Sequence, residues 1–390
     1  MIVFEVILVC TALLILLPVL VLFAQVLLAM WPRTVRQITG LRPSLAVLIP
    51  AHNEASVIAD TLAALLPQLS AGDRIVVIAD NCTDNTAEIA VAKGVEVIMR
   101  MDDERRGKSY ALDFGVRHIS YNPPEVAIII DADCKAHNGS LDTLSRMAFQ
   151  LKQSVQALDL MTSPPDAGLK SQISEFAWLV KNHVRPLGYQ QLGFPCQLMG
   201  TGMAFPWQAL SEAKLASGHI VEDLKLGLDL ACAGTFTFFC PEALVTSVFP
   251  SNEQTITAQR TRWEHGHLLV ILSELPRVLK AAIQQRSIGL LVLALDLCVP
   301  PLALLSLLII VLLLISLSYY AVSASSLALV IAFTESVMFG IAILLSWLKY
   351  GRQVISFSNL ARIPAYILWK IPLYLKFLVN KQVSWVKTKR

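Results

Sequence analysis

Asp131 and Asp133 stand two residues apart in the tetrapeptide DADC, directly after a short apolar run. Side chains two positions apart on an extended chain point to the same side, so both carboxylates can reach one ligand. Carboxylate oxygens suit hard divalent cations such as Mg²⁺ and Mn²⁺. A cation held by this pair would neutralise a diphosphate group. Asp-x-Asp is also common in ordinary loops, so the tripeptide alone does not establish a metal site.

A second pair of carboxylates, Glu222 and Asp223, lies in the segment GHIVEDLKLG near the expected start of a helix. Acidic side chains often cap the first turn of a helix by accepting hydrogen bonds from its free N–H groups. A carboxylate can also act as a general base by taking a proton from an attacking hydroxyl. The sequence leaves both roles open for this pair.

Asp80 ends another apolar run and begins the acidic turn DNCTDNT. The turn has the pattern of a helix start with Thr83 or Asp84 as the cap, which accounts for Asp84. Asp80 precedes the turn. We therefore expect its carboxylate to accept hydrogen bonds from a nucleotide base or ribose.

Three cations, Arg105, Arg106 and Lys108, flank Gly107 where a further helix is expected to begin. Cations oppose the helix dipole at this end, so the arrangement favours an anionic partner such as phosphate. A solvated charged surface explains the same three residues equally well.

Short apolar runs alternate with helix-length amphipathic stretches in the region that contains these residues. The runs are LAVLIP, RIVVIAD, VEVIMR and VAIIID, and each precedes a longer segment. Alternation of this kind predicts an α/β domain with a mostly parallel sheet. Ligands bind at the carboxyl ends of such strands, and the polar stretches PAHNEA, ADNCTDNT and DADC follow three of the runs.

Several other function classes fit the sequence poorly. A dinucleotide-binding oxidoreductase needs a glycine-rich turn after its first strand, and PAHNEA has no glycine. A transporter would need more membrane spans and carboxylates within them. The net charge of +3, without a block of Lys and Arg, argues against nucleic acid as a partner.

The composition indicates a membrane protein, because 55% of the residues are hydrophobic and only 16% are charged. Residues 6–30 carry no charge and are long enough to cross a bilayer, which needs roughly 20 apolar residues. Arg33 and Arg36 follow directly, and Lys and Arg collect on the cytoplasmic side of membranes. The domain after this span is therefore expected in the cytosol, with its seven cysteines reduced.

The last third of the chain contains further apolar runs. The run from Ile288 to Tyr320 carries Asp296 and is broken by two prolines, which favours an interfacial or re-entrant segment followed by a span from about Leu302. Another span is expected from Leu327 to Trp347. These patterns divide the chain into a transmembrane helix (1–31), a globular domain (42–275), the interfacial or re-entrant segment (276–301), two transmembrane helices (302–350), and an amphipathic interfacial helix with a basic tail (351–390).

The motifs together resemble those of the membrane-bound family-two glycosyltransferases, a group that includes cellulose, hyaluronan and poly-N-acetylglucosamine synthases. The likeness runs from Leu45 to His267. It rests on PAHNEA, ADNCTDNT, RRGKSYAL, DAD, ED and QRTRW in this order. Each motif is weak alone, but the ordered set is specific. The resemblance implies a GT-A fold, in which a UDP-sugar lies across the strand ends, and an inverting transfer to an acceptor hydroxyl.

The resemblance also implies roles for individual residues. Asp223 matches the catalytic base, with Glu222 beside it, although Val221 stands where the family motif usually has Thr. The remaining matches are Glu54, Asp80, Lys108 and Asp131 for nucleotide and phosphate contacts, Asp131 and Asp133 for the metal, and Gln259, Arg262 and Trp263 for the Gln-x-x-Arg-Trp motif near diphosphate and acceptor.

The expected protein is thus a metal-dependent inverting glycosyltransferase, multi-pass in the inner (plasma) membrane, that makes exopolysaccharide or cell-surface polysaccharide. Its expected partners are a UDP-sugar, a glycan or lipid-linked acceptor, membrane lipid and a polysaccharide export system, with Mg²⁺ or Mn²⁺ as cofactor. One alternative is a glycolipid synthase acting on ceramide, diacylglycerol or polyprenyl phosphate. The other is a non-enzymatic membrane scaffold, which would give the carboxylates no shared task.

Overall fold

A computed structural model describes residues 2–32, 38, 40–164, 167–219, 221–250 and 253–379, with backbone alone for 253–258, 260, 369 and 376–379. The chain forms two compact units. The helical unit comprises Met1–Arg33, Ser163–Gly193 and Thr257–Gln382, and the sheet unit comprises Thr34–Thr162, Phe194–Ile256 and Val383–Arg390. Arg33, Arg36 and the basic tail, which were used to predict the orientation, lie outside the described residues.

The sheet unit contains an eight-stranded sheet with strand order β3-β2-β1-β4-β7-β6-β8-β5. The first four strands in this order are mutually parallel, whereas β7 is antiparallel to both of its neighbours. This confirms the predicted mostly parallel α/β sheet. The strands are β1 (Leu45–Ala51), β2 (Arg74–Asp80), β3 (Glu96–Arg100), β4 (Val126–Ile129), β5 (Lys135–Ala136), β6 (Ser154–Thr162), β7 (Met203–Pro206) and β8 (Thr237–Val248).

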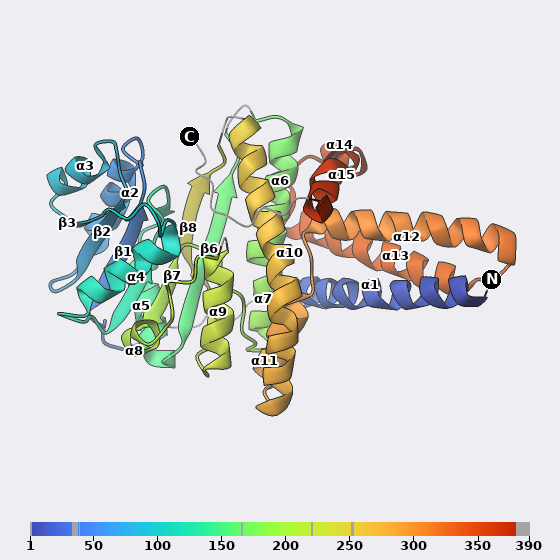
Figure 1. Ribbon diagram of the computed structural model, residues 1–390, viewed down its shortest axis with the longest axis horizontal. Coiled ribbons are helices and arrows are strands. Elements are labelled where there is room, and N and C mark those ends of the chain that lie inside the picture. The colour runs from blue at the N-terminus through green and yellow to red at the C-terminus, as the bar shows by residue number, and fades with distance from the viewer. Residues whose placement is uncertain are drawn as a thin grey trace. The chain divides into compact units, whose positions relative to one another are not determined.

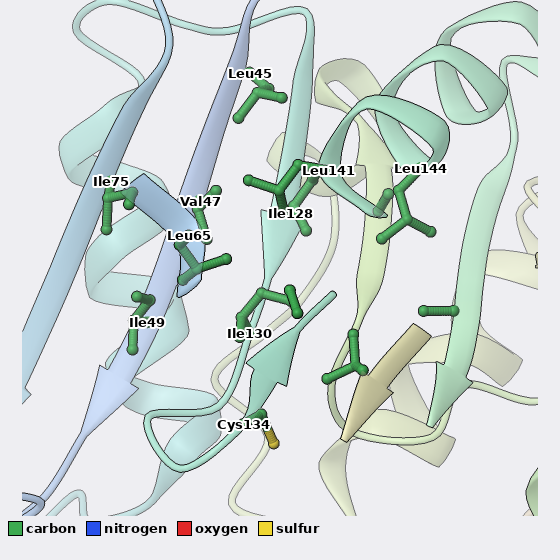
Figure 2. Close-up of a cluster of buried hydrophobic side chains, with 14 of the residues drawn as sticks. Leu45, Val47, Ile49, Leu65, Ile75, Ile128, Ile130, Cys134, Leu141 and Leu144 are labelled. Carbon is green, nitrogen blue, oxygen red and sulfur yellow. The ribbon is translucent and has the colours of Figure 1, made fainter. Parts of the chain in front are cut away.

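Helices cover both faces of this sheet. Leu45, Val47 and Ile49 of β1 point to one face and pack against α2 (Ile58–Leu65), α3 (Thr86–Ala92) and α5 (Ser140–Leu151), as Figure 2 shows for Leu65, Leu141 and Leu144. Ala46 and Leu48 point to the other face, toward α4 (Lys108–Ile119), α8 (Trp207–Ser211) and α9 (Glu222–Cys232). Each fully buried aliphatic side chain contributes about 1.5–3 kcal/mol. Burial on both faces explains why the strands read as unbroken apolar runs.

Among the described residues, three helices of the helical unit are long and apolar enough to cross a membrane: Ile2–Ala29 (α1), Leu302–Ser323 (α12) and Leu327–Gly351, which joins α13 (Leu327–Ser346) to the π-helical turn η3 (Trp347–Gly351). They lie side by side in Figure 1. The Ser325 hydroxyl hydrogen-bonds Glu5, and Lys349 Nζ donates to the Ala29 carbonyl over 2.9 Å. Because these contacts join corresponding ends, α1 and α13 run parallel.

The remaining elements of this unit are shorter or less apolar. They are α6 (Leu169–Leu179), the π-helical turn η2 (Val180–Val184), α7 (Arg185–Gln191), α10 (Glu253–Gln284), α11 (Ile288–Leu297), α14 (Phe357–Leu360) and α15 (Ile363–Val379). The helix α10 belongs to the helical unit from Thr257 onward.

A buried polar network joins α1, α7 and α11. Arg185 Nη2 lies 2.7 Å from Asp296 Oδ1, and Arg185 Nε donates to Gln25 Oε1 over 3.0 Å. Gln25 Nε2 donates to Asp296 Oδ1 over 2.6 Å, and all three residues are at most 7% exposed. A Cβ on Gly188 would lie 2.0 Å from the Gln25 carbonyl oxygen, so only glycine allows α7 this close to α1. The network gives Asp296, conspicuous in its apolar run, a structural partner.

Candidate active site

The site begins at the carboxyl ends of β2 and β3, where Asp80 pairs with Arg100. Arg100 Nη1 lies 2.6 Å from Asp80 Oδ1, and both side chains are at least nine-tenths buried. Burial raises the pKa of Asp80, although the hydrogen bond from Arg100 acts to lower it. Arg100 also reaches Asp102 over 2.9 Å. This pairing could not be predicted from the sequence, because Arg100 only ends an apolar run.

The turns after β1 and β2 are tied to each other. Asn53 has a left-handed φ of 56° and exchanges hydrogen bonds with Thr83, whose N–H donates to Asn53 Oδ1 over 2.6 Å. The Glu54 N–H donates to Thr86 Oγ1 over 2.8 Å, and the Ala55 N–H donates to Asp84 Oδ2 over 3.1 Å. These bonds fix the backbone at Glu54 beside the turn that follows Asp80.

Arg105 and Arg106 find their anionic partners within the chain. Arg105 Nε lies 3.1 Å from Asp102 Oδ2, and Arg106 pairs with Asp103. Both arginine side chains are more than half exposed. A phosphate partner is therefore not needed to explain Arg105 and Arg106, because two aspartates just before them already supply the opposite charge.

Lys108, the first residue of α4, points inward and contacts two groups. Its Nζ pairs with Asp131 and donates to the Gly200 carbonyl over 2.6 Å. Burial acts to lower the pKa of Lys108, but the nearby carboxylates of Asp131 and Glu222 outweigh it and raise the pKa. The lysine is thus a fixed positive charge beside Asp131, which follows β4.

Asp131, Asp133 and Cys134 form a cluster that could hold a metal ion. Their ligand atoms all lie within 4.8 Å of one another. Burial and the adjacent Asp131 raise the pKa of the Cys134 thiol well above its usual range. Sulfur is also a soft donor, which hard cations such as Mg²⁺ and Mn²⁺ do not favour. The two carboxylates remain as hard oxygen donors, which fit Mg²⁺ or Mn²⁺.

A glycine-rich loop just before β7 reaches this cluster. Gly200 has φ +97°, and a Cβ there would lie 3.4 Å from Asp223 Oδ2 and 4.0 Å from Lys108 Nζ. The next residue, Thr201, is buried, and its Oγ1 accepts a hydrogen bond of 3.1 Å from the Asp131 N–H. The loop therefore places the Gly200 backbone beside Lys108 and Asp223.

A buried glutamine holds this loop in place. Gln156 of β6 is fully buried, donates to the Thr201 carbonyl over 2.8 Å and accepts from the Met199 N–H over 2.8 Å. The sequence shows a cluster of Gly and Pro in this region but gives no sign that Gln156 supports it. A buried polar residue within an apolar strand is the signal that could have found it.

Glu222 and Asp223 form the first turn of α9 and line a pocket together with Lys108 and Ser109. The residue before the helix, Val221, has an apolar side chain that cannot cap it. Burial and the neighbouring Asp223 raise the pKa of Glu222 to about 7, although Lys108 acts to lower it. The side chains of Glu222, Asp223 and Lys108 therefore line the same pocket, next to the Gly200 backbone.

The Gln-x-x-Arg-Trp residues lie on α10 in the helical unit. Gln259 is buried, and the Trp263 ring packs on Trp178 of α6, with ring centroids 5.0 Å apart. Arg262 Nε is buried and has no hydrogen-bond partner among the described residues. Trp178 carried no motif and was not predicted from the sequence.

Two histidines, His265 and His267, follow this motif on α10. His265 Nε2 lies 3.2 Å from the Leu373 carbonyl oxygen, and the buried His267 has a pKa lowered to about 3, mainly by burial.

Comparison with known proteins gives one consistent family. The family model described as "Glycosyltransferase like family 2" matches residues 43–266. A probable glycosyltransferase of Bacillus subtilis, YdaM, is 26% identical over 262 residues, covering 61% of this chain and 58% of that protein. Poly-beta-1,6-N-acetyl-D-glucosamine synthase of Staphylococcus aureus is 26% identical over 236 residues, covering 58% and 55%. The chain thus spans little more than half the length of these relatives.

Among solved structures, the mannosyltransferase PcManGT from Pyrobaculum calidifontis, in complex with GDP-Man and Mn²⁺, matches with a TM-score of 0.56 at 18% identity. The match covers 96% of this chain and all of that one. It supports the fold predicted from the alternation of strands and helices. With the family match over more than half of its length, this chain belongs to the family described as "Glycosyltransferase like family 2" and contains a GT-A domain.

Proposed function

We propose that this chain is a membrane-anchored inverting glycosyltransferase that moves a sugar from a UDP-sugar to a glycan or lipid-linked acceptor in the synthesis of exopolysaccharide or cell-surface polysaccharide. The observation that carries the proposal is the convergence of Lys108, Asp131, Glu222 and Asp223 around the Gly200 backbone. The Staphylococcus aureus relative, a poly-beta-1,6-N-acetyl-D-glucosamine synthase, supports a polysaccharide as product.

The donor would lie across the strand ends. Asp80 and the fixed turn at Glu54 would contact the nucleotide, and Lys108 would face its phosphates. Asp131 and Asp133 would hold a divalent cation, which would supply positive charge to the leaving diphosphate. For Arg262 the Gln-x-x-Arg-Trp resemblance implies a role in binding diphosphate, and its buried Nε, which lacks a partner among the described residues, suits an anion.

The transfer itself would be a single displacement. The acceptor oxygen attacks the anomeric carbon from the side opposite the diphosphate, so the new C–O bond forms as the bond to the diphosphate breaks. Asp223 takes the acceptor's proton, and the diphosphate leaves with the bonding electrons. The closeness of Asp223 to Lys108, which is proposed to face the phosphates, supports this role, and a general base typically contributes about 10²–10⁴ in rate.

Membrane anchoring is proposed from the three long apolar helices. Anchoring would keep the enzyme close to an acceptor that grows at the membrane or is attached to it. The Trp263 indole is proposed to form a wall of the acceptor site. Its place on α10 within the helical unit supports this assignment.

The proposal is tested with the purified full-length protein and a panel of radiolabelled donors: UDP-glucose, UDP-N-acetylglucosamine and GDP-mannose. We expect label from one UDP-sugar in insoluble polymer, with or without label in the lipid extract, and EDTA should abolish it. Label in the lipid extract alone would identify a glycolipid synthase. Transfer from GDP-mannose alone would contradict the assigned donor, and full activity in EDTA would contradict the metal role of Asp131 and Asp133.

A further inference from the structure

Three helices of the helical unit form a closed set of contacts around Trp263. The first contact is the packing of Trp263 of α10 on Trp178 of α6, with ring planes tilted by 43°. Lys181 Nζ lies 5.4 Å from the Trp178 ring centroid, which adds a cation–π contact on α6's side. The indole of Trp263 is thus held on one side by α6.

The second contact joins α10 to α15, starting one residue after Trp263. Glu264 forms an ion pair with Lys370, and the side chains of both are about one-tenth exposed. His265 Nε2 lies 3.2 Å from the Leu373 carbonyl oxygen. Two successive residues of α10 are therefore bound to α15 directly after the tryptophan.

The third contact joins α15, and the short α14 before it, back to α6. Tyr366 Oη lies 3.4 Å from Ser174 Oγ, and Asn359 Nδ2 of α14 donates to Gln172 Oε1 over 3.0 Å. Lys370 Nζ also lies 5.5 Å from the Tyr366 ring centroid. Lys370 therefore contacts both the glutamate that follows Trp263 and the tyrosine that reaches the helix carrying Trp178.

An ion pair this deeply buried is a poor source of stability, because removing both charges from water offsets most of their attraction. Buried ionic pairs are best attested as devices that select one register or orientation. Here the charge pair fixes how α10 is rotated against α15. That rotation determines where Arg262 and Trp263, two and one positions before Glu264, direct their side chains.

We propose that Lys370 of α15 is a positioning residue for glycosyl transfer, acting through Glu264 to hold Trp263 against Trp178. The inference rests on the proposed role of Trp263 in the acceptor site. It assigns a catalytic purpose to α15, which the sequence identified only as an amphipathic interfacial helix. Because Lys370 is proposed to act through Glu264, its effect should appear in turnover and not in donor binding.

The test compares Lys370→Met, Glu264→Gln and the charge swap Glu264→Lys/Lys370→Glu with Lys280→Met, which removes an exposed lysine of α10. The first readout needs no substrate: the exciton couplet of the packed indoles in far-ultraviolet circular dichroism, identified by its loss in Trp178→Phe. We expect Lys370→Met and Glu264→Gln to weaken the couplet, the swap to restore it, and Lys280→Met to leave it unchanged.

The second readout is steady-state kinetics. We expect kcat of Lys370→Met to fall roughly tenfold with the donor KM changed less than about twofold, since small misplacements of a site residue can cost up to about 100-fold. The swap should regain most of this loss. A wild-type couplet in Lys370→Met, or a swap that restores neither couplet nor kcat, would overturn the inference. An enzyme without transfer to any acceptor would count against the proposed function, while the couplet would still test the role of Lys370.

Discussion

Lys108 and Asp80 each have an oppositely charged neighbour that favours the charged form of the side chain. Lys108 stays positive because Asp131 and Glu222 face it, and Asp80 is held by Arg100. Asp80, Asp131 and Asp133 could be singled out from the sequence because they follow apolar runs whose ends meet at one sheet edge. Lys108 could be singled out because it stands among cations at an expected helix start. The Asp80–Arg100 pair could not, because the contact depends on β2 and β3 lying in register.

Glu222 provides a pH prediction at this scale. Its pKa is raised from 4.5 to about 7, so the folded protein binds this proton more tightly than the unfolded chain does. Its contribution to stability is therefore complete below about pH 4.5 and is lost as the pH rises through about 7. Glu222→Gln, which mimics the protonated form, should avoid that loss.

We expect the thermal unfolding midpoints of wild type and Glu222→Gln to agree at pH 5 and to differ at pH 8, with the variant higher by roughly 2–4 °C. Asp229→Asn, which changes an acid on a later turn of the same helix, serves as a control for general charge effects. Equal midpoints at pH 8, or a variant less stable at both pH values, would show that Glu222 does not hold its proton in the folded protein.

At the scale of elements, the strands that are easiest to predict from the sequence are those buried on both faces of the sheet. Strands β1 to β4 are buried on both faces and read as apolar runs, and α9 begins at the predicted carboxylates. The half of the sheet from β5 to β8 and the Gly200 loop were not predicted. Their positions depend on antiparallel pairing between distant segments, and Lys108 meets Gly200 across 92 residues of chain.

The buried network of Gln25, Arg185 and Asp296 yields a stability prediction for the helical elements. Asp296→Leu removes the carboxylate and leaves the buried Arg185 guanidinium without its opposite charge, which typically costs about 3–5 kcal/mol. The double variant Arg185→Met/Asp296→Leu removes both charges and should regain much of that loss. Thermal unfolding in detergent would measure both. A double variant no more stable than the single one would mean that charge compensation is not what holds α11 to α7.

At the scale of the whole chain, the orientation of the spans is still a prediction. The helices α1 and α13 run parallel, so their carboxyl ends lie at the same end of the bundle. Lys349 and Arg352, which follow α13, therefore lie near the carboxyl end of α1. Basic residues favour the cytoplasmic side. We therefore expect the N-terminus outside and the C-terminus inside. Reporter fusions at residues 1 and 390 would check this, and cytosolic reporter activity at residue 1 would contradict it.

The central claim is that Asp223 takes the acceptor's proton during sugar transfer, and Asp223→Asn tests it most directly. Asn serves the first turn of a helix about as well as Asp does, so the fold should persist while proton acceptance is lost. Binding of the UDP-sugar should also persist, because it is assigned to Asp80, Lys108, Asp131 and Asp133. With donor binding and transfer measured on the same folded preparation, the account predicts near-normal binding and a transfer rate reduced by about 10²–10⁴. A folded Asp223→Asn protein that transfers sugar at close to the wild-type rate would contradict the account and make Glu222 the next candidate for the base.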